Sequence, residues 1–197
     1  MVKIGKKAPD FKAQAFHNEE FKEITLTEYK GKWIVLFFYP GDFTFVCPTE
    51  ITSIALRYKE IEKLDAEILA ISVDSVFVHK MWQQDELSKM IEQGVLFPML
   101  SDLGGKIGKA YGVYDEEKGV DVRARFIIDP DGVIKSIELL DLSVGRSVEE
   151  LIRQINAFIH VRKTGGKELC PSNWVPGKEI IMNDPDFAGE ISKIWKP

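Results

Sequence analysis

The sequence predicts an α/β domain in which a central mixed β-sheet is flanked by helices. Three observations lead to this fold class. Continuous apolar runs alternate with stretches in which apolar residues recur every three or four positions, as buried strands and amphipathic helices do. Two further strand-like runs, at 124–128 and 133–139, are separated by the turn sequence DPDG (129–132). The chain has 197 residues, of which 45% are apolar, so it can fill the core of one domain.

The first half of the chain contains two strand–helix units. Residues 33–39 (WIVLFFY) are apolar throughout, which is typical of a strand buried on both faces. Helical spacing of apolar residues follows over 49–64, then a second buried strand over 67–74 and a helix over about 77–93. The N-terminal 30 residues are expected to add a short hairpin around His17–Glu20.

The second half adds a strand hairpin and a long helix. Residues 96–100 (LFPML) predict a short extended segment, which Pro98 restricts to an edge or a bend. A small helix is expected over 106–111, and the hairpin over 124–139 should be antiparallel. A helix over 148–162 then ends at a Thr-Gly-Gly breaker.

The order of these elements, β-α-β followed by β-β-α, is the connectivity of a thioredoxin-like domain. Strands that alternate with helices imply a mostly parallel sheet with helices on both faces. We expect residues 1–163 to form this domain, with the hairpin as an N-terminal extension. Residues 164–197 are expected to form a C-terminal tail of the same unit, rich in Pro and Gly, that carries Cys170.

The composition argues against several classes of partner. The formal net charge is −5 and no Lys/Arg cluster offsets it, so no nucleic-acid-binding surface is expected. The N-terminal residues MVKIGKKAPDF lack an apolar signal region, and the longest apolar run is too short to span a bilayer. We therefore expect a cytoplasmic protein with no membrane partner.

The two cysteines, Cys47 and Cys170, are too few for a disulfide framework and form no Cys-x-x-Cys pair, which argues against a disulfide reductase. The three histidines have no metal-type spacing, so a metal site is not expected. The glycine-rich stretches at 104–108 and 165–167 fit neither a phosphate loop nor a dinucleotide-binding fingerprint. No bound cofactor is expected.

Cys47 lies where the first predicted strand ends and a helix begins, the edge at which α/β sheets carry their sites. Pro48 suits the first helical position, and Glu50 stands three residues after Cys47 as in a capping box with sulfur in place of the hydroxyl. The unpaired N–H groups of a first helical turn favour a thiolate. Thr44 can add a hydroxyl on the same side and Pro40 can exclude water. These residues alone leave two interpretations open, an inert buried cysteine and a reactive thiol.

The spacing Pro40-x-x-x-Thr44-x-x-Cys47 resembles the active-site signature of the peroxiredoxins. The longer stretch FYPGDFTFVCPTEI is similar to the typical two-cysteine subgroup, close to the C component of alkyl hydroperoxide reductase. The similarity extends along almost the whole chain and includes FPMLSD (97–102), a Val-Gly-Arg that ends at Arg146, and a late Cys-Pro at Cys170.

The resemblance implies a thiol peroxidase that reduces hydrogen peroxide and organic hydroperoxides in antioxidant defence. Cys47 would attack the peroxide and become a sulfenic acid. Thr44 and Arg123 would bind the peroxide and the thiolate, and Pro40 would shield them. Of two arginines that share a strand face, the family match selects Arg123, and Arg125 is expected in a surface or interface ion pair.

The resemblance also implies supporting residues. Glu50 and Arg146 would form an ion pair that orients Arg123. Cys170 would be the resolving thiol, which condenses with the sulfenic acid to a disulfide, usually with Cys47 of the partner subunit. Trp174, as an apolar anchor, is expected to pack the segment that carries Cys170.

The implied partners are a reductant and further copies of the chain. Thioredoxin or an AhpF-type disulfide reductase would restore the thiols. Relatives form homodimers through edge strands and rings of five dimers through the loop that here carries Phe43 and Phe45. A function of another class, a redox-regulated holdase chaperone or a peroxide sensor, is the alternative, and the two functions can coexist.

We predict that Cys47 resists overoxidation. Peroxide-sensitive members of the family carry a Gly-Gly-Leu-Gly motif before FPMLSD and a Tyr-Phe pair in an extra C-terminal helix. Residues 90–96 read MIEQGVL here and the chain ends GEISKIWKP, so both motifs are absent. Mass spectrometry after modest peroxide, with a reductant turning over, should find almost no sulfinic acid on Cys47; its accumulation would contradict this prediction.

Overall fold

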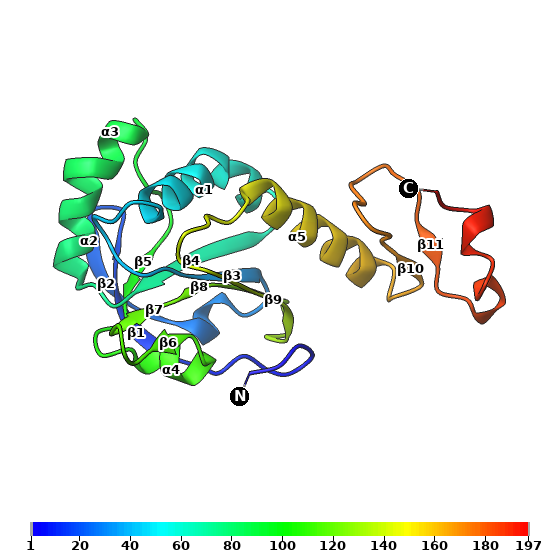
Figure 1. The fold of residues 1–197 in the computed structure, drawn as a ribbon, viewed down its shortest axis with the longest axis horizontal. Helices are drawn as coiled ribbons and strands as arrows, with labels where there is room; N and C mark the ends of the chain where they lie inside the picture. Colours follow the sequence, from blue (N-terminus) through cyan, green and yellow to red (C-terminus); the bar gives the residue numbers. More distant parts are fainter. Residues whose placement is uncertain (1, 197) are drawn as a thin grey trace. The chain divides into compact units, whose positions relative to one another are not determined.

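The computed structural model describes residues 2–196 and divides them into two compact units, one that reaches to Val148 and one that starts at Glu149. The first unit is built on a seven-stranded sheet in the order β2-β1-β5-β4-β3-β8-β9 (Figure 1). The thioredoxin-like fold and the mixed sheet that the sequence predicts are confirmed. The strands of this sheet are β1 (Lys12–His17), β2 (Glu20–Thr25), β3 (Trp33–Phe38), β4 (Ala66–Ser72), β5 (Met99–Ser101), β8 (Arg123–Ile128) and β9 (Ile134–Leu140).

The pairing of the strands corrects the expectation of a mostly parallel sheet. Only β3–β4 and β4–β5 are parallel, whereas β1–β2, β1–β5, β3–β8 and β8–β9 are antiparallel. The N-terminal hairpin β1–β2 forms as predicted, and it joins the sheet beside β5. Of the two alternatives predicted for the LFPML segment, the edge position is wrong, and a bend is present at Phe97, before β5. Pro98 precedes β5, so its missing N–H breaks no ladder bond, and its carbonyl accepts from the Ala70 N–H at 3.0 Å.

The helices begin and end close to the predicted residues. The helices of the first unit are η1 (Leu26–Tyr29, 3-10), α1 (Cys47–Glu62), α2 (Val76–Trp82), η2 (Gln83–Leu87), α3 (Ser88–Met90) and α4 (Lys106–Tyr111). The predicted helix over 77–93 is interrupted by η2, a five-residue π-helical stretch, and ends at Met90. Apolar spacing predicts a helix in general, but it does not distinguish an α-helical turn from a π-helical one.

The core lies on both faces of the central strand β3, whose six residues are all buried. On one face, Leu36 and Phe38 join a cluster that includes Ile107 and Tyr111 of α4. On the opposite face, β4 contacts α1, which buries Ile51, Ile54, Ala55 and Tyr58 along its apolar side. The unbroken apolar run of β3 is therefore explained by burial from two sides.

The antiparallel pairing of β8 with β3 decides where the first residue of β8 lies. Phe38, the last residue of β3, pairs with Ala124. Arg123 consequently stands at the carboxyl end of β3, next to the segment that leads to α1. The hairpin β8–β9, with the turn at 129–132, forms as predicted and holds this register.

The second unit consists of α5 (Val148–Lys163), whose first residue is the last of the first unit, and of a short antiparallel pair, β10 (Glu168–Leu169) with β11 (Ile181–Met182). Two 3-10 turns follow, η3 (Pro185–Phe187) and η4 (Ile191–Lys193). Cys170 comes directly after β10. The predicted boundary between a domain and a tail at residue 163 stays a prediction.

A small hairpin that the sequence analysis missed, β6 (Tyr114–Asp115) with β7 (Val120–Asp121), buries a carboxylate. Asp121 is fully buried, and neither of its oxygens has a hydrogen-bond partner among the described residues. It lies against Gly108, where an added Cβ would come within 1.9 Å of Asp121 Oδ1. Burial, together with the neighbouring charge of Asp102, raises the pKa of Asp121 to about 8.

The variant Asp121→Asn is expected to be more stable than the parent at pH 8. The folded-state pKa lies above the unfolded value of about 3.9, so ionisation favours unfolding and stability falls as the pH rises from about 4 to 8. The amide does not ionise, so the variant should be more stable than the parent by about 5 kcal/mol at pH 8 and by less than about 1 kcal/mol at pH 4. Urea unfolding at several pH values measures this gain, with Asp115→Asn, an ion-paired residue of the same hairpin, as control. A gain that does not depend on pH would contradict the prediction.

Candidate active site

The strand β3 and the helix α1 place Cys47 at the start of a helix. The residue is the first of α1 and is fully buried, and Pro48 is the second helical residue. The first helical turn predicted for the thiol is therefore present, but the capping box is wrong. Val46 is the N-cap residue and no side chain caps it; its carbonyl accepts from the Thr49 and Glu50 N–H groups at 3.1 and 3.2 Å. The side chain of Glu50 is instead engaged by two arginines.

Arg123 connects Cys47 to this carboxylate. Its Nη1 donates to Cys47 Sγ at 3.4 Å and to Glu50 Oε2 at 2.6 Å. Its Nε donates to the Leu142 carbonyl at 2.9 Å, and only 3% of the residue is exposed. The guanidinium is thus held in one orientation at the sulfur, inside the protein.

Arg146 holds the other side of the Glu50 carboxylate. Its backbone N–H and its Nε donate to Glu50 Oε1 at 2.7 and 2.8 Å, and its Nη2 donates to Oε2 at 3.0 Å. The guanidinium also stacks 3.5 Å above the centre of the Phe37 ring. Burial by itself would raise the pKa of Glu50, but its hydrogen bonds and charge interaction with Arg146, reinforced by Arg123, hold that pKa below its usual range.

The other residues singled out in the sequence, Thr44, Pro40 and Arg125, take no part in the Glu50 ion pairs. The Thr44 hydroxyl donates to the Gly41 carbonyl at 2.9 Å, which closes a turn of the loop before Cys47; Pro40, just before this turn, is half-buried. Arg125 does form an ion pair, at 3.0 Å with Glu138, but its side chain is 1% exposed. The ion pair expected for Arg125 is therefore present, and of the two expected locations, surface or interface, the surface one is wrong because the side chain is buried.

Sequence reasoning missed a second buried cluster beside this loop. Asp42 accepts from the Tyr39 hydroxyl at 2.7 Å, and its other oxygen lies 2.7 Å from His79 Nδ1. The Asp42 N–H donates to Asp74 Oδ2 at 2.8 Å. In the sequence, Asp42 stands inside the signature stretch and His79 stands in a predicted helix. The two residues are far apart in the chain, so no local spacing pattern predicts their contact.

Cys170 is held by its own unit. Its Sγ lies 3.7 Å from the Ala157 carbonyl of α5, and burial raises the pKa of the Cys170 thiol despite the nearby Arg153. Arg153 donates to the Trp174 carbonyl at 3.1 Å, and the Trp174 ring lies 5.0 Å from that of His160. Trp174 is buried, as an anchor of this segment should be.

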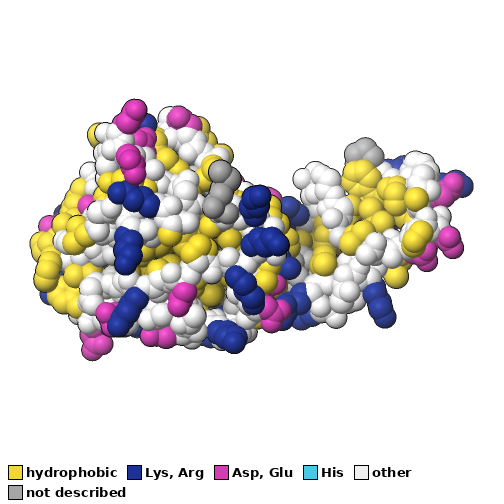
Figure 2. Space-filling view, turned by 90° about the horizontal axis from the view of Figure 1, so that it is seen from below, with side chains coloured by type: hydrophobic (Ala, Val, Ile, Leu, Met, Phe, Trp, Pro, Cys, Tyr) yellow, Lys and Arg dark blue, Asp and Glu magenta, His cyan; other side chains and the backbone are white. Residues whose placement is uncertain are grey.

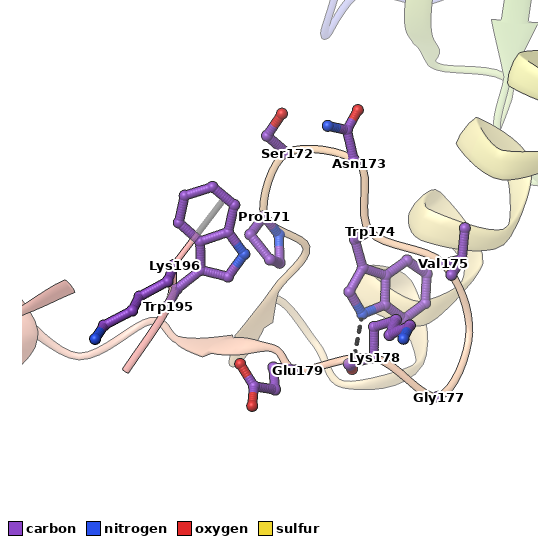
Figure 3. A pocket seen from close by; sticks show the side chains of 10 residues that line it. All are labelled: Pro171, Ser172, Asn173, Trp174, Val175, Gly177, Lys178, Glu179, Trp195 and Lys196. Atoms are coloured by element: carbon purple, nitrogen blue, oxygen red, sulfur yellow. Dashed lines mark hydrogen bonds between the residues drawn. The ribbon is translucent and has the colours of Figure 1, made fainter. Parts of the chain in front are cut away.

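A surface cleft of about 660 Å³ begins at the residue after Cys170 (Figure 3). Trp174 forms one wall, with its Nε1 bonded to the Lys178 carbonyl at 3.1 Å, and Trp195 points toward Pro171. The cleft is lined by Pro171, Ser172, Asn173, Trp174, Val175, Gly177, Lys178, Glu179, Trp195 and Lys196.

In residues 2–196, no group of three or more His, Cys, Asp or Glu residues could hold a metal ion. Within the same range, every helix is too short or too polar to cross a membrane. Both cysteines are free thiols. On the face drawn in Figure 2, Lys and Arg side chains are interspersed with acidic and apolar ones.

Comparison with known proteins gives two family matches. Residues 4–137 match the model described as the AhpC/TSA family, and residues 157–193 match the model of the C-terminal domain of 1-Cys peroxiredoxin. The first match alone covers more than half of the chain.

Individual relatives span nearly the whole chain. It is 57% identical over 195 residues to the selenocysteine-containing peroxiredoxin PrxU of Peptoclostridium acidaminophilum, which covers 99% of this chain and 96% of the relative. It is 44% identical over 188 residues to the chloroplastic 2-Cys peroxiredoxin BAS1 of Hordeum vulgare, covering 95% and 89%. The crystal structure of the reduced 2-Cys peroxiredoxin of Plasmodium vivax superimposes with a TM-score of 0.90 at 36% identity, covering 98% of this chain and all of that chain.

The variant Glu50→Gln is expected to lose about 3 kcal/mol of unfolding free energy at pH 7, because it leaves two buried guanidinium groups without their carboxylate. The folded-state pKa of Glu50 is lowered, so its contribution is present above the unfolded pKa of about 4.3 and is lost as the pH falls through the folded value. The difference from the parent should therefore shrink below about pH 4. Glu60→Gln breaks an exposed pair with Arg57 and should cost less than about 1 kcal/mol. Equal losses in the two variants would contradict the prediction.

Proposed function

Because this chain belongs to the peroxiredoxins, in the typical two-cysteine subgroup of thiol peroxidases, we propose that Cys47 is the thiol that attacks the peroxide. The observation that carries the proposal is the buried Arg123, whose Nη1 is shared between Cys47 Sγ at 3.4 Å and Glu50 Oε2 at 2.6 Å. A thiolate, rather than a thiol, is the nucleophile, and a fixed cation at the sulfur stabilises it.

The charges of the buried groups support the same conclusion. Arg123 and Arg146 contribute two positive charges and Glu50 contributes one negative charge, all inside the protein. An uncompensated buried charge is unfavourable. A thiolate at Cys47 would balance the surplus positive charge, so this arrangement of charges favours the anion that the reaction needs.

The reaction proceeds as a displacement at oxygen. The Cys47 thiolate attacks one peroxide oxygen; an S–O bond forms while the O–O bond breaks, and the sulfur is oxidised to sulfenic acid. The second oxygen leaves as hydroxide or alkoxide and takes up a proton to become water or alcohol. Arg123 stabilises the charge that develops on the leaving oxygen, which is worth more in a buried site than in water.

Thr44 and Pro40 define the place of the peroxide. The Thr44 hydroxyl donates a hydrogen bond to the Gly41 carbonyl, so the lone pairs of the Thr44 oxygen are free to accept a hydrogen bond from a hydroperoxide O–H. Pro40 has no N–H and is half-buried, so it shields the site without competing for the substrate. Glu50 and Arg146 act behind this pocket, because they hold Arg123 in place.

Cys170 completes the cycle as the resolving thiol. Its sulfur attacks the Cys47 sulfenic acid of the partner subunit, an S–S bond forms and water leaves. Residues 164–197, the predicted tail, bring it there. A thioredoxin- or AhpF-type reductase then breaks the disulfide by thiol–disulfide exchange. We place this cycle in the cytoplasm, as the sequence predicts.

Two exposed surfaces support assembly of the chain with further copies. β9 is an edge strand of the sheet and exposes Leu139, which fits a dimer that continues the sheet across the edge strands. Phe43 and Phe45, in the loop before Cys47, are 51% and 95% exposed, which fits a second interface that closes five dimers into a decamer.

A peroxide-consumption assay with thioredoxin and its reductase tests the cycle. The parent should turn over, whereas Cys47→Ser should not react at all and Cys170→Ser should consume about one equivalent of peroxide per chain before it stops. On a non-reducing gel after peroxide, only the parent should run as a disulfide-linked dimer. Turnover by Cys47→Ser would overturn the role of Cys47. A monomeric disulfide would overturn the intersubunit step. A holdase without peroxidase activity would protect client proteins equally in all three.

A further inference from the structure

We propose that Asp42 and His79 are positioning residues of the peroxide pocket. Their buried contact holds the loop 41–46, which carries Thr44 and leads into Cys47, in the reactive arrangement. This inference rests on the proposed function in one respect, since it takes Cys47 and Thr44 as the residues that meet the peroxide.

The loop has little apolar anchoring of its own. Phe43 and Phe45 are exposed, and Phe43 has a φ of 52°, a left-handed conformation that is unfavourable for a bulky residue. Such a conformation persists only where the surroundings impose it. The groups that hold residue 42 from inside the protein are therefore the main constraint on this turn.

Three segments of the first unit converge on Asp42. The Tyr39 hydroxyl, at the end of β3, lies 2.7 Å from Oδ1. His79 Nδ1, from α2, lies 2.7 Å from Oδ2. The backbone N–H of Asp42 donates at 2.8 Å to Asp74, which follows β4 and also accepts from the Ser72 hydroxyl at 2.8 Å. Both carboxylate oxygens and the N–H of one loop residue are thus used.

His79 is itself fixed at both ring nitrogens. Its Nε2 lies 3.1 Å from the Leu100 carbonyl of β5, and its side chain and that of Asp42 are 0% exposed. With oxygen acceptors on both sides, the pair is either an imidazolium facing a carboxylate or a neutral imidazole facing a carboxylic acid. The net charge of the pair is zero in both forms, so the contact places no net charge in the core. Its direction is set by the hydrogen bonds at the two ring nitrogens.

The position of Asp42 is passed on to Thr44 through the turn. The Thr44 hydroxyl donates to the carbonyl of Gly41, the residue before Asp42, so the two ends of the turn move together. Trp82 supports the same segment, with its ring 5.9 Å from that of Tyr39 and 6.4 Å from that of Phe43. Cys47, in contrast, is held from β8 by Arg123. Loss of the Asp42–His79 contact should displace Thr44 and leave the thiolate in place.

The rates of oxidation and of alkylation of Cys47, both measured in the full-length protein, distinguish an effect on peroxide positioning from an effect on thiol reactivity. Oxidation of Cys47 by hydrogen peroxide needs Thr44 in place, whereas alkylation of Cys47 by iodoacetamide, followed at that residue by mass spectrometry, depends on the thiolate and not on Thr44. For Asp42→Leu we expect the peroxide rate constant to fall about 100-fold and the alkylation rate to change less than about 3-fold. Asp42→Asn can still accept from Tyr39 and donate to a neutral His79 Nδ1, so it should recover most of the peroxide rate.

Two further variants keep the test decisive if Asp42→Leu does not fold. His79→Gln retains a donor for Asp42 but gives up the Leu100 contact, and Asp42→Leu/His79→Leu removes both members of the pair together. Both should lower the peroxide rate at least about 10-fold with alkylation preserved. Glu67→Gln is the matched control, because Glu67 accepts a hydrogen bond of 2.6 Å from Tyr58 away from the loop, and its peroxide rate should equal that of the parent.

Several results would overturn the inference. A peroxide rate within about 3-fold of the parent in Asp42→Leu, or an equal fall in its alkylation rate, would show that the pair does not position the peroxide. A rate in Asp42→Asn as low as in Asp42→Leu would assign the effect to charge instead of placement. If the parent itself shows no Cys47-dependent peroxide reduction, the proposed function fails first; normal parent turnover with an unaffected Asp42→Leu overturns this inference alone.

Discussion

The site depends on one buried interaction, the Glu50 carboxylate held between the guanidinium groups of Arg123 and Arg146. Each oxygen of Glu50 accepts two hydrogen bonds. Of these four bonds, one comes from Arg123 and three come from Arg146. Charges are unfavourable inside a protein unless they are paired and fully hydrogen-bonded, and this cluster meets that condition for the carboxylate. It leaves one positive charge in excess, and that excess is directed at Cys47.

The sheet makes this interaction possible. Arg123 begins β8, and the antiparallel pairing of β8 with β3 brings it to the strand end from which the chain continues to Cys47. Arg146 comes after β9 and reaches the same carboxylate through its backbone as well as its side chain. The first turn of α1 then contributes Cys47 and Glu50 on one helical face. Residues far apart in the chain therefore meet because three strands have a defined register.

The loop before Cys47 is constrained from two directions. On one side Arg123 holds the sulfur, and on the other side the contact of Asp42 with His79 holds the turn that carries Thr44. The aromatic residues of the loop remain exposed between these constraints. This division fits a segment whose polar groups are held in register while its aromatic side chains stay exposed.

The sequence by itself determined the local structure of this protein. Apolar periodicity predicts the strands, most helices and the hairpin, because burial of one or both faces leaves a repeat in the chain. The strand end at Cys47 and the resemblance around it predicted a reactive thiol there. Only the tertiary structure decided the contacts at long range: Glu50 meets two arginines instead of capping its helix, β5 lies inside the sheet, and Arg125 is buried. His79 contacts Asp42, and the Asp121 carboxylate has no hydrogen-bond partner among the described residues. These contacts depend on strand register and on which distant residues the fold brings together. A local sequence pattern predicts neither of these.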